Sequence, residues 1–312
     1  QAVPESSLSC GPLVDWRRDF GRGMLWAAAG LVWSSLSWLL GWFWWLTVKP
    51  SLYVLGAGAA WHLAQRWFYR LLARQLAGPS GWFGKNVAPT LLRDLNSACV
   101  RWALPRIPIA DEKSCKSVLD VGCGGSLAFE PFWERFKDPS TCVLEGIDSS
   151  SEAIEHCSEV VAGRPRVNLT LGSVLQLPWD ANHFDMVCAF NILDILAADQ
   201  EKRALDEMIR CLRPGGTLAV TTKEPSSYLR APETQAGIQQ RICRIITTPN
   251  IKIALLRAGL EDVKQEFQTQ EECNALTDEG QPVQIPSILT TGRKPRNLSD
   301  PHPSSTIPPS SQ

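Results

Sequence analysis

Two glycines and a nearby aspartate stand where their types and spacing can bind a charged ligand. Gly122 and Gly124 follow the apolar run 117–121, and a helix is predicted over 127–136, so the glycines occupy a strand-to-helix turn. Glycine at such a turn permits a positive φ and lets a ligand approach the backbone closely. Asp120 places a carboxylate in the same turn, which suits a cationic or ammonium-bearing ligand.

A second carboxylate, Asp148, ends the next apolar strand, which is predicted over 142–147. It lies 24 residues beyond Gly124, close to the offset of about 20 residues at which an acid binds ribose hydroxyls in nucleotide-binding sheets. A dinucleotide fingerprint would need a third glycine where this chain has Leu127. The pattern therefore favours a nucleoside without phosphates over a dinucleotide.

With these residues the chain resembles the class I S-adenosylmethionine-dependent methyltransferases, in the branch of quinone, sterol and small-molecule enzymes. The resemblance covers about residues 118–221. Besides the glycine turn and Asp148, it rests on the segments 172–179, 183–187 and 212–218. It implies a Rossmann-like, seven-stranded α/β sheet and S-adenosyl-L-methionine as the cofactor, with no metal ion.

The resemblance also assigns roles by position. Gly122 and Gly124 would pass the methionine moiety, Asp148 would take both ribose hydroxyls, and the turn at Ser173 and Val174 would face the adenine. Ser173 stands where the family usually has an acid, so we expect a weaker bond to the adenine amino group and modest cofactor affinity. The full set of expected cofactor-binding residues is Asp120, Gly122, Cys123, Gly124, Asp148, Ser149, Ser173, Val174 and Asn191.

Methyl transfer from a sulfonium depends mainly on positioning, so a dedicated base is optional. Asn191 and Asp194 follow the predicted strand 184–190, and loops at the carboxyl ends of strands face the ligand crevice. The catalytic candidates are these two residues, Lys223 and Glu224 after the next strand, and His183, which also reads as a surface turn residue. Asp194 is the best of them for orienting the substrate or accepting a proton. The alternative for Asp194 is a solvated loop acid or a helix cap.

The predicted elements alternate between strands and helices, which builds a mostly parallel sheet with helices on both faces. They are strands at 117–121, 142–147, 167–171, 184–190, 216–222, 261–267 and 286–291, and helices at 127–136, 151–162, 199–212 and 251–258. By resemblance the last two strands form an antiparallel hairpin. The methyltransferase domain is expected at 113–292, and the proline- and serine-rich tail at 293–312 is expected to be disordered.

A long uncharged stretch precedes this domain. After a polar segment at 1–23, residues 24–48 contain no charged side chain. As a helix these 25 residues would span about 37 Å, longer than the ~30 Å hydrocarbon core of a bilayer. The aromatic cluster at 42–45 and Lys49 suit the membrane interface. The stretch predicts a transmembrane helix, with a buried hairpin of a soluble protein as the alternative.

A second apolar or interfacial helix is predicted at 50–77. Arg66, Arg70 and Arg74 recur every four residues, which places them on one helical stripe suited to anionic lipid headgroups. The alternative is an ordinary solvated face over a packed helix. Residues 78–112 are expected to form a linker and cap over the site, with a helix at 90–103.

Basic residues flank both sides of the uncharged stretch, so charge does not decide between a single pass and a hairpin. Either way we expect a cytoplasmic methyltransferase domain, at the endoplasmic reticulum if the source is eukaryotic. The net charge of −1 argues against a nucleic-acid partner. Ten cysteines without a C-x-x-C pair indicate neither a metal nor a disulfide framework, and hence a reducing compartment.

The resulting hypothesis is a membrane-anchored methyltransferase acting on a lipophilic small molecule or lipid, such as a quinone, sterol-like or phenolic compound. Methylation at oxygen, nitrogen or carbon is left open, as is the oligomeric state. The alternatives are a small-thiol or amine methyltransferase, a protein-modifying enzyme, and a catalytically inactive membrane scaffold. The scaffold alternative rests on Ser173 and on the segment 191–196, which lacks the paired histidines common in this branch.

Overall fold

The structure is a computed structural model that describes residues 50–109, 115–125, 128–136, 142–229, 232–246, 248–277 and 285–296. The predicted polar segment at 1–23 and transmembrane helix at 24–48 lie outside these residues, as does the tail from 297 onward.

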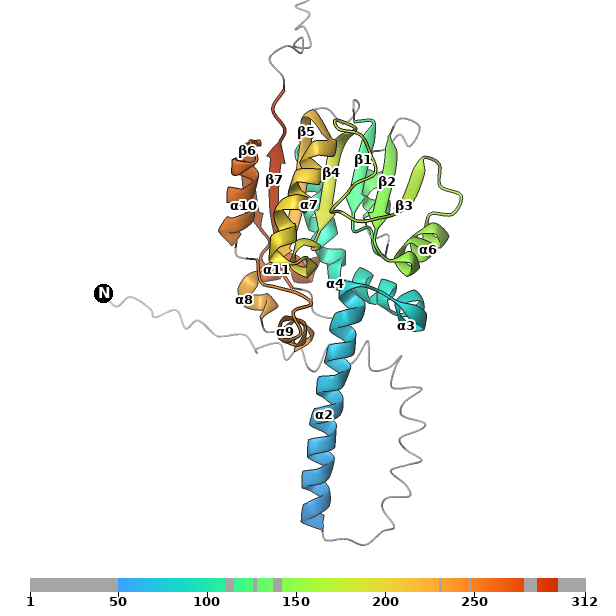
Figure 1. The fold of residues 1–312 in the computed structure, drawn as a ribbon, viewed down its shortest axis with the longest axis vertical. Helices are drawn as coiled ribbons and strands as arrows, with labels where there is room; N and C mark the ends of the chain where they lie inside the picture. Colours follow the sequence, from blue (N-terminus) through green and yellow to red (C-terminus); the bar gives the residue numbers. More distant parts are fainter. Residues whose placement is uncertain are drawn as a thin grey trace, which may run out of the picture.

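A seven-stranded sheet forms the centre of the protein (Figure 1). Its spatial order is β3 (Val167–Leu171), β2 (Val143–Asp148), β1 (Ser117–Val121), β4 (Phe184–Phe190), β5 (Leu212–Lys223), β7 (Ser287–Arg293) and β6 (Glu261–Phe267). The neighbouring strands β3, β2, β1, β4 and β5 pair in parallel. Strand β7 runs antiparallel to both of its neighbours, β5 and β6. The predicted strands and the closing hairpin are therefore confirmed.

The order of the strands reverses beside β1, which pairs with β2 on one edge and with β4 on the other. In an open α/β sheet the carboxyl ends of the strands at such a point border a ligand crevice. All five residues of β1 are buried. The glycine turn that follows β1 is therefore held by the most enclosed part of the sheet.

Side chains alternate between two cores, one on each face of the sheet. Along β4, Met186 and Cys188 join the cluster that contains Phe129 and Phe132, whereas Val187 joins the other cluster. The helices that cover the sheet agree with the predicted ones to within a few residues. They are α5 (Phe129–Arg135), α6 (Ser151–Val160), α7 (Ala198–Cys211) and α10 (Thr248–Arg257).

Several short elements were not predicted. They are α3 (Gly81–Asn86), α8 (Pro225–Tyr228), α9 (Pro232–Gln239), α11 (Gln270–Ala275) and the 3-10 turns η1 (Leu104–Arg106) and η2 (Leu193–Ile195). Most of these span only a turn or two, which is too short for a periodic apolar pattern to build up.

Helices α2 (Pro50–Ala77) and α4 (Ala88–Ala103) confirm the helices predicted before the sheet. Figure 1 shows α2 as a long helix that projects from the domain, with only its carboxyl end against the body. Among the described residues, no helix combines the length and the apolar character needed to cross a bilayer. Helix α4 lies against the glycine turn, since a Cβ at Gly125 would come within 2.7 Å of the Pro89 carbonyl oxygen.

Candidate functional site

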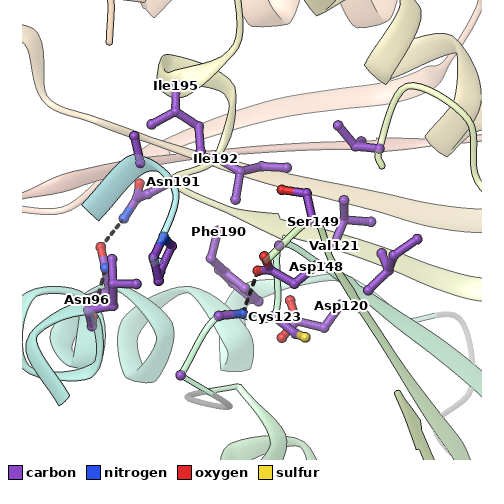
Figure 2. Close-up of a pocket in the computed structure, with 18 of the residues that line it drawn as sticks. Asn96, Asp120, Val121, Cys123, Asp148, Ser149, Phe190, Asn191, Ile192 and Ile195 are labelled. Carbon is purple, nitrogen blue, oxygen red and sulfur yellow. Dashed lines mark hydrogen bonds between the residues drawn. The ribbon is translucent and has the colours of Figure 1, made fainter. Parts of the chain in front are cut away.

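A cavity of about 310 Å³ lies at the carboxyl ends of β1, β2 and β4 and is also lined by residues of α4 and of the end of α2. Figure 2 shows most of its lining. Its size is in the usual range for a small-molecule site. The structure brings to it all nine residues predicted to bind the cofactor: Asp120, Gly122, Cys123, Gly124, Asp148, Ser149, Ser173, Val174 and Asn191. Their shared location is established, while their individual contacts to a ligand stay predictions.

The turn after β1 has a shape that glycine alone fits well. Gly122 has a φ of +72°, and Gly124 has a φ of +45°. A Cβ at Gly122 would clash with Cγ2 of Ile192. The N–H groups of Gly122 and Cys123 both donate to the Ile147 carbonyl, at 2.8 and 3.1 Å, which ties the turn to β2. The turn is therefore rigid and leaves its backbone open to a ligand.

The carboxylate of Asp148 is held by two backbone donors. Its Oδ2 accepts from the Gly124 N–H at 2.9 Å and its Oδ1 accepts from the Ser150 N–H at 2.9 Å. Burial raises the pKa of Asp148, and these backbone hydrogen bonds oppose that shift. A carboxylate offers about four acceptor positions, so each oxygen can still accept a hydroxyl. This geometry suits two neighbouring ribose hydroxyls.

Asp120 adds a second acid in a less polar setting. Its side chain is 3% exposed. Burial, and then the charge of Asp148, raise the pKa of Asp120 to about 8. A cation placed in the cavity would favour the ionised form and reverse part of this shift. Asp120 is therefore a group whose charge depends on whether a cationic ligand is present.

The segment 172–179 is fixed from behind by α7. The Glu207 carboxylate accepts from the Leu177 N–H at 2.8 Å, and the Arg210 guanidinium donates to the carbonyls of Leu177 and Trp179 at 2.9 and 2.8 Å. Arg210 and Glu207 also pair with each other at 2.9 Å. The Ser173 hydroxyl already accepts from the Leu175 N–H at 3.2 Å, which makes this turn compact.

Asp194 does not lie where a catalytic residue of this cavity would have to lie, which corrects the sequence-based prediction. It lies in η2 and is 6% exposed, and it is absent from the described lining of the cavity. The tight turn carries it away from the site, and its carbonyl accepts from the Arg244 N–H at 2.7 Å. The Arg244 side chain in turn pairs with Glu201 and donates to the carbonyls of Leu193 and Leu196. Asp194 therefore faces neither the solvent nor the candidate ligand.

Sequence reasoning placed a helix at 90–103 in a cap over the site but did not identify the residues of α4 that line the cavity. Arg93 brings a cation to the cavity and Asn96 brings an amide, while Leu92 and Val100 supply apolar surface. A signal was present: Asn96 lies four residues from both Leu92 and Val100, so a polar side chain sits within the apolar stripe of this helix. A polar residue in such a stripe indicates a buried partner or a site.

Residues 118–216 match the family model described as a methyltransferase domain. The chain carries a class I S-adenosylmethionine-dependent methyltransferase domain. The match covers the glycine turn, both aspartates and the segment that faces the predicted adenine position.

Two curated relatives of the methyltransferase domain act in quinone biosynthesis. The chain is 31% identical over 113 residues to a ubiquinone biosynthesis O-methyltransferase of Candida albicans, covering 35% of this chain and 33% of that protein. It is 32% identical over 132 residues to a ubiquinone/menaquinone biosynthesis C-methyltransferase of Dinoroseobacter shibae, and this match covers 42% of this chain and 48% of that protein. The chain thus spans a third to a half of the length of these relatives.

Solved structures confirm the fold of the domain. A phosphoethanolamine N-methyltransferase of Haemonchus contortus, solved with S-adenosyl-L-methionine, superposes with a TM-score of 0.51 at 15% identity, covering 69% of this chain and 59% of that one. A Haloferax volcanii methyltransferase solved with its activator superposes with a TM-score of 0.51 at 20% identity, covering 69% of this chain and 96% of that one. At these identities the likeness concerns the fold alone.

The residues of the cavity fit S-adenosylmethionine. Asp148 has acceptor positions left for the ribose, the open backbone of the glycine turn accommodates the methionine chain, and Asp120 can face its ammonium group. When bound, the cofactor supplies an electrophilic methyl group on a positively charged sulfur. The protein supplies binding and orientation.

Proposed function

We propose that this protein is a membrane-associated methyltransferase that methylates a lipophilic small molecule or lipid. The observation that carries the proposal is the course of α2. Its carboxyl end contributes Leu76 and Ala77 to the lining of the cofactor cavity, while the rest of the helix projects from the domain (Figure 1). One helix therefore connects the site to a surface that is suited to a bilayer.

The projecting part of α2 exposes large apolar side chains. Trp61 is 60% exposed, Leu63 66% and Trp67 66%, and Trp82 of the neighbouring α3 is 72% exposed. Leu63 and Trp67, four residues apart, share one face of α2, and exposed large apolar side chains on one face mark an interaction surface. Tryptophan is also enriched at the boundary between lipid and water.

The same helix carries the charges that an anionic bilayer attracts. Arg66, Arg70 and Arg74 are exposed, and α2 contains no acidic residue. Arginine beside tryptophan on one helix is typical of interfacial helices. Because the uncharged residues 24–48 come directly before α2, we place 24–48 in the bilayer, α2 at its surface and the methyltransferase domain in the cytoplasm.

The cavity itself suits an apolar acceptor. Its apolar lining includes Leu92 and Val100 of α4, together with Phe190, Ile195 and Leu196. Two of the relatives are methyltransferases of quinone biosynthesis, which supports a quinone-like or phenolic acceptor. A lipophilic acceptor concentrated in the bilayer would reach the cavity along α2.

A site-specific fluorophore tests this arrangement. A fluorescent non-natural residue replaces Trp67 in the full chain. Its emission should shift to the blue when vesicles containing anionic lipid are added, because the probe enters the interface. The same residue at Leu256, which is 52% exposed on α10, is the matched control and should not shift. Equal shifts at both positions, or none at Trp67, would refute the proposed role of α2.

Flotation of the full chain with the same vesicles tests membrane association as a whole. The proposal expects the protein in the lipid fraction even after alkaline washing. Recovery in the soluble fraction would contradict the placement of residues 24–48.

A further inference from the structure

Two asparagines meet on one side of the cavity. The Nδ2 of Asn191, after β4, donates to the Oδ1 of Asn96, on α4, at 2.9 Å (Figure 2). Asn191 is further fixed by Thr221, whose hydroxyl donates to Asn191 Oδ1 at 3.2 Å and accepts from the Asn191 N–H at 3.0 Å. Asn191 has a φ of +55°, so this network holds its backbone in a left-handed conformation that few non-glycine residues adopt.

Lys223, at the end of β5, lies behind the pair. Its Nζ donates to Asn96 Oδ1 at 2.9 Å and to the Leu95 carbonyl at 3.2 Å. The side chain is half-buried, and within the described part of the chain no carboxylate pairs with it. Burial raises the pKa of the neighbouring Cys273 to about 11, so that thiol does not neutralise the lysine.

The network leaves hydrogen-bond donors unused. Asn96 Nδ2 donates one N–H to the Leu92 carbonyl at 2.8 Å, and Asn191 Nδ2 donates one to Asn96. Each amide nitrogen has a second N–H with no acceptor among the described residues. Asn96 Oδ1 accepts from two donors, one of them charged, and this polarises the amide so that its remaining N–H becomes a stronger donor.

The pair lies apart from Asp120 and Asp148, the two acids expected to hold the cofactor. Figure 2 shows Asn96 and Asn191 on one side of the cavity and Asp120 and Asp148 on the other. The aspartates provide the negative charge that an ammonium group and a ribose require. Among the described lining residues, the asparagine side has no carboxylate, presents amide N–H donors and has Lys223 behind it.

We propose that Asn96 and Asn191, supported by Lys223, bind an ionised oxygen of the methyl acceptor. This inference rests on the proposed function and narrows it to acceptors that carry an acidic hydroxyl, as a phenol does. The hydroxyl proton is lost to water before the transfer. The phenolate oxygen then forms the new C–O bond as the C–S bond breaks. The electron pair of the C–S bond stays on sulfur, so the products are a methyl ether and S-adenosylhomocysteine.

This assignment explains how the reaction proceeds without a base on the acceptor side. Among the described lining residues, the carboxylates lie on the cofactor side, and the acceptor side offers amides and Arg93. Stabilising the ionised acceptor replaces the need to remove its proton during the transfer. Lys223 acts through Asn96 and is a positioning residue, whereas the two asparagines contact the acceptor.

Binding of 4-nitrophenol to the full chain in detergent micelles, loaded with S-adenosylhomocysteine, tests the proposal without turnover. The phenolate form of this dye absorbs visible light and the phenol form does not, so its apparent pKa in the site can be titrated. The wild type should lower that pKa by about one unit relative to protein-free micelles. Lys223→Met and Asn96→Asp should abolish the shift, because the first removes the charge and the second adds an opposing one.

Three comparisons make the test decisive. Lys223→Arg keeps the charge and should keep most of the shift, and Lys202→Met, an exposed lysine of α7, should behave as the wild type. S-adenosylhomocysteine affinity should stay within about twofold in every variant. An unshifted dye in the wild type, a shift that survives Lys223→Met, or a parallel loss of S-adenosylhomocysteine affinity would each overturn this assignment. Loss of vesicle binding would instead overturn the proposed function.

Discussion

The carboxylate of Asp148 accepts a hydrogen bond from the backbone N–H of Gly124 at 2.9 Å, so the end of β2 and the turn after β1 form one unit. The acid expected to bind the ribose thereby also fixes the turn expected to carry the methionine chain. Disturbing either residue should affect both halves of the cofactor site.

Asp148→Asn should weaken S-adenosylmethionine binding about 10- to 100-fold, because the amide replaces one charged acceptor with a donor. Titration calorimetry on the full chain measures the effect. Asp206→Asn, an exposed acid of α7, is the matched control and should bind as the wild type. Unchanged affinity in Asp148→Asn would remove this residue from the site.

Asp120 makes cofactor binding depend on pH. The pKa of this acid is raised to about 8, so it ionises as the pH rises from about 6.5 to 8.5, and attraction for the ammonium group grows with it. Affinity measured across this range should therefore increase. Asp120→Asn should flatten the profile, and a slope that persists in this variant would assign the titration to another group.

The stability of the cofactor-free protein should show the opposite trend. In the unfolded chain Asp120 ionises near pH 3.8, whereas in the folded protein it keeps its proton until about pH 8. Between these values the folded state binds more protons, so the Asp120 contribution to the free energy of unfolding falls as the pH rises. Urea denaturation of wild type and Asp120→Asn should diverge across this window. Parallel curves would contradict the burial of an acid at this position.

Gly122→Ala tests the shape of the turn. The added Cβ clashes with Ile192, and a φ of +72° costs alanine about 1–2 kcal/mol. Gly163→Ala is the matched control, since Gly163 has a φ of +76° and nothing within 4 Å of an added Cβ. Both variants should lower the melting temperature, but only Gly122→Ala should also lose cofactor affinity. Equal cofactor affinity in the two variants would show that the turn tolerates a side chain.

Arg210→Lys should loosen the segment 172–179. Lysine lacks the fork that reaches the Leu177 and Trp179 carbonyls together with Glu207. Several-fold weaker S-adenosylmethionine binding and faster hydrogen exchange at residues 173–177 are the expected results. An effect on affinity without a change in exchange would place the role of Arg210 elsewhere.

Much of this architecture could be predicted because it depends on local patterns. The strands around Val118, Val187 and Leu218 are mainly apolar runs, and the glycine turn and Asp148 follow the ends of two such strands. The position of Asp194 could not be predicted, because its turn is held by a hydrogen bond from the backbone of Arg244, which follows 50 residues later. The role of Asn96 depends in the same way on Asn191 and Lys223.

The most direct test of the account follows the methyl group itself. The full chain, tritiated S-adenosylmethionine and a total lipid extract from cells that express the protein are incubated, and label is measured in the organic phase. The account predicts labelled lipophilic product with the wild type and with Asp206→Asn, and none with Asp148→Ala. Label that enters only water-soluble thiols or amines, or no label despite measurable cofactor binding, would contradict it.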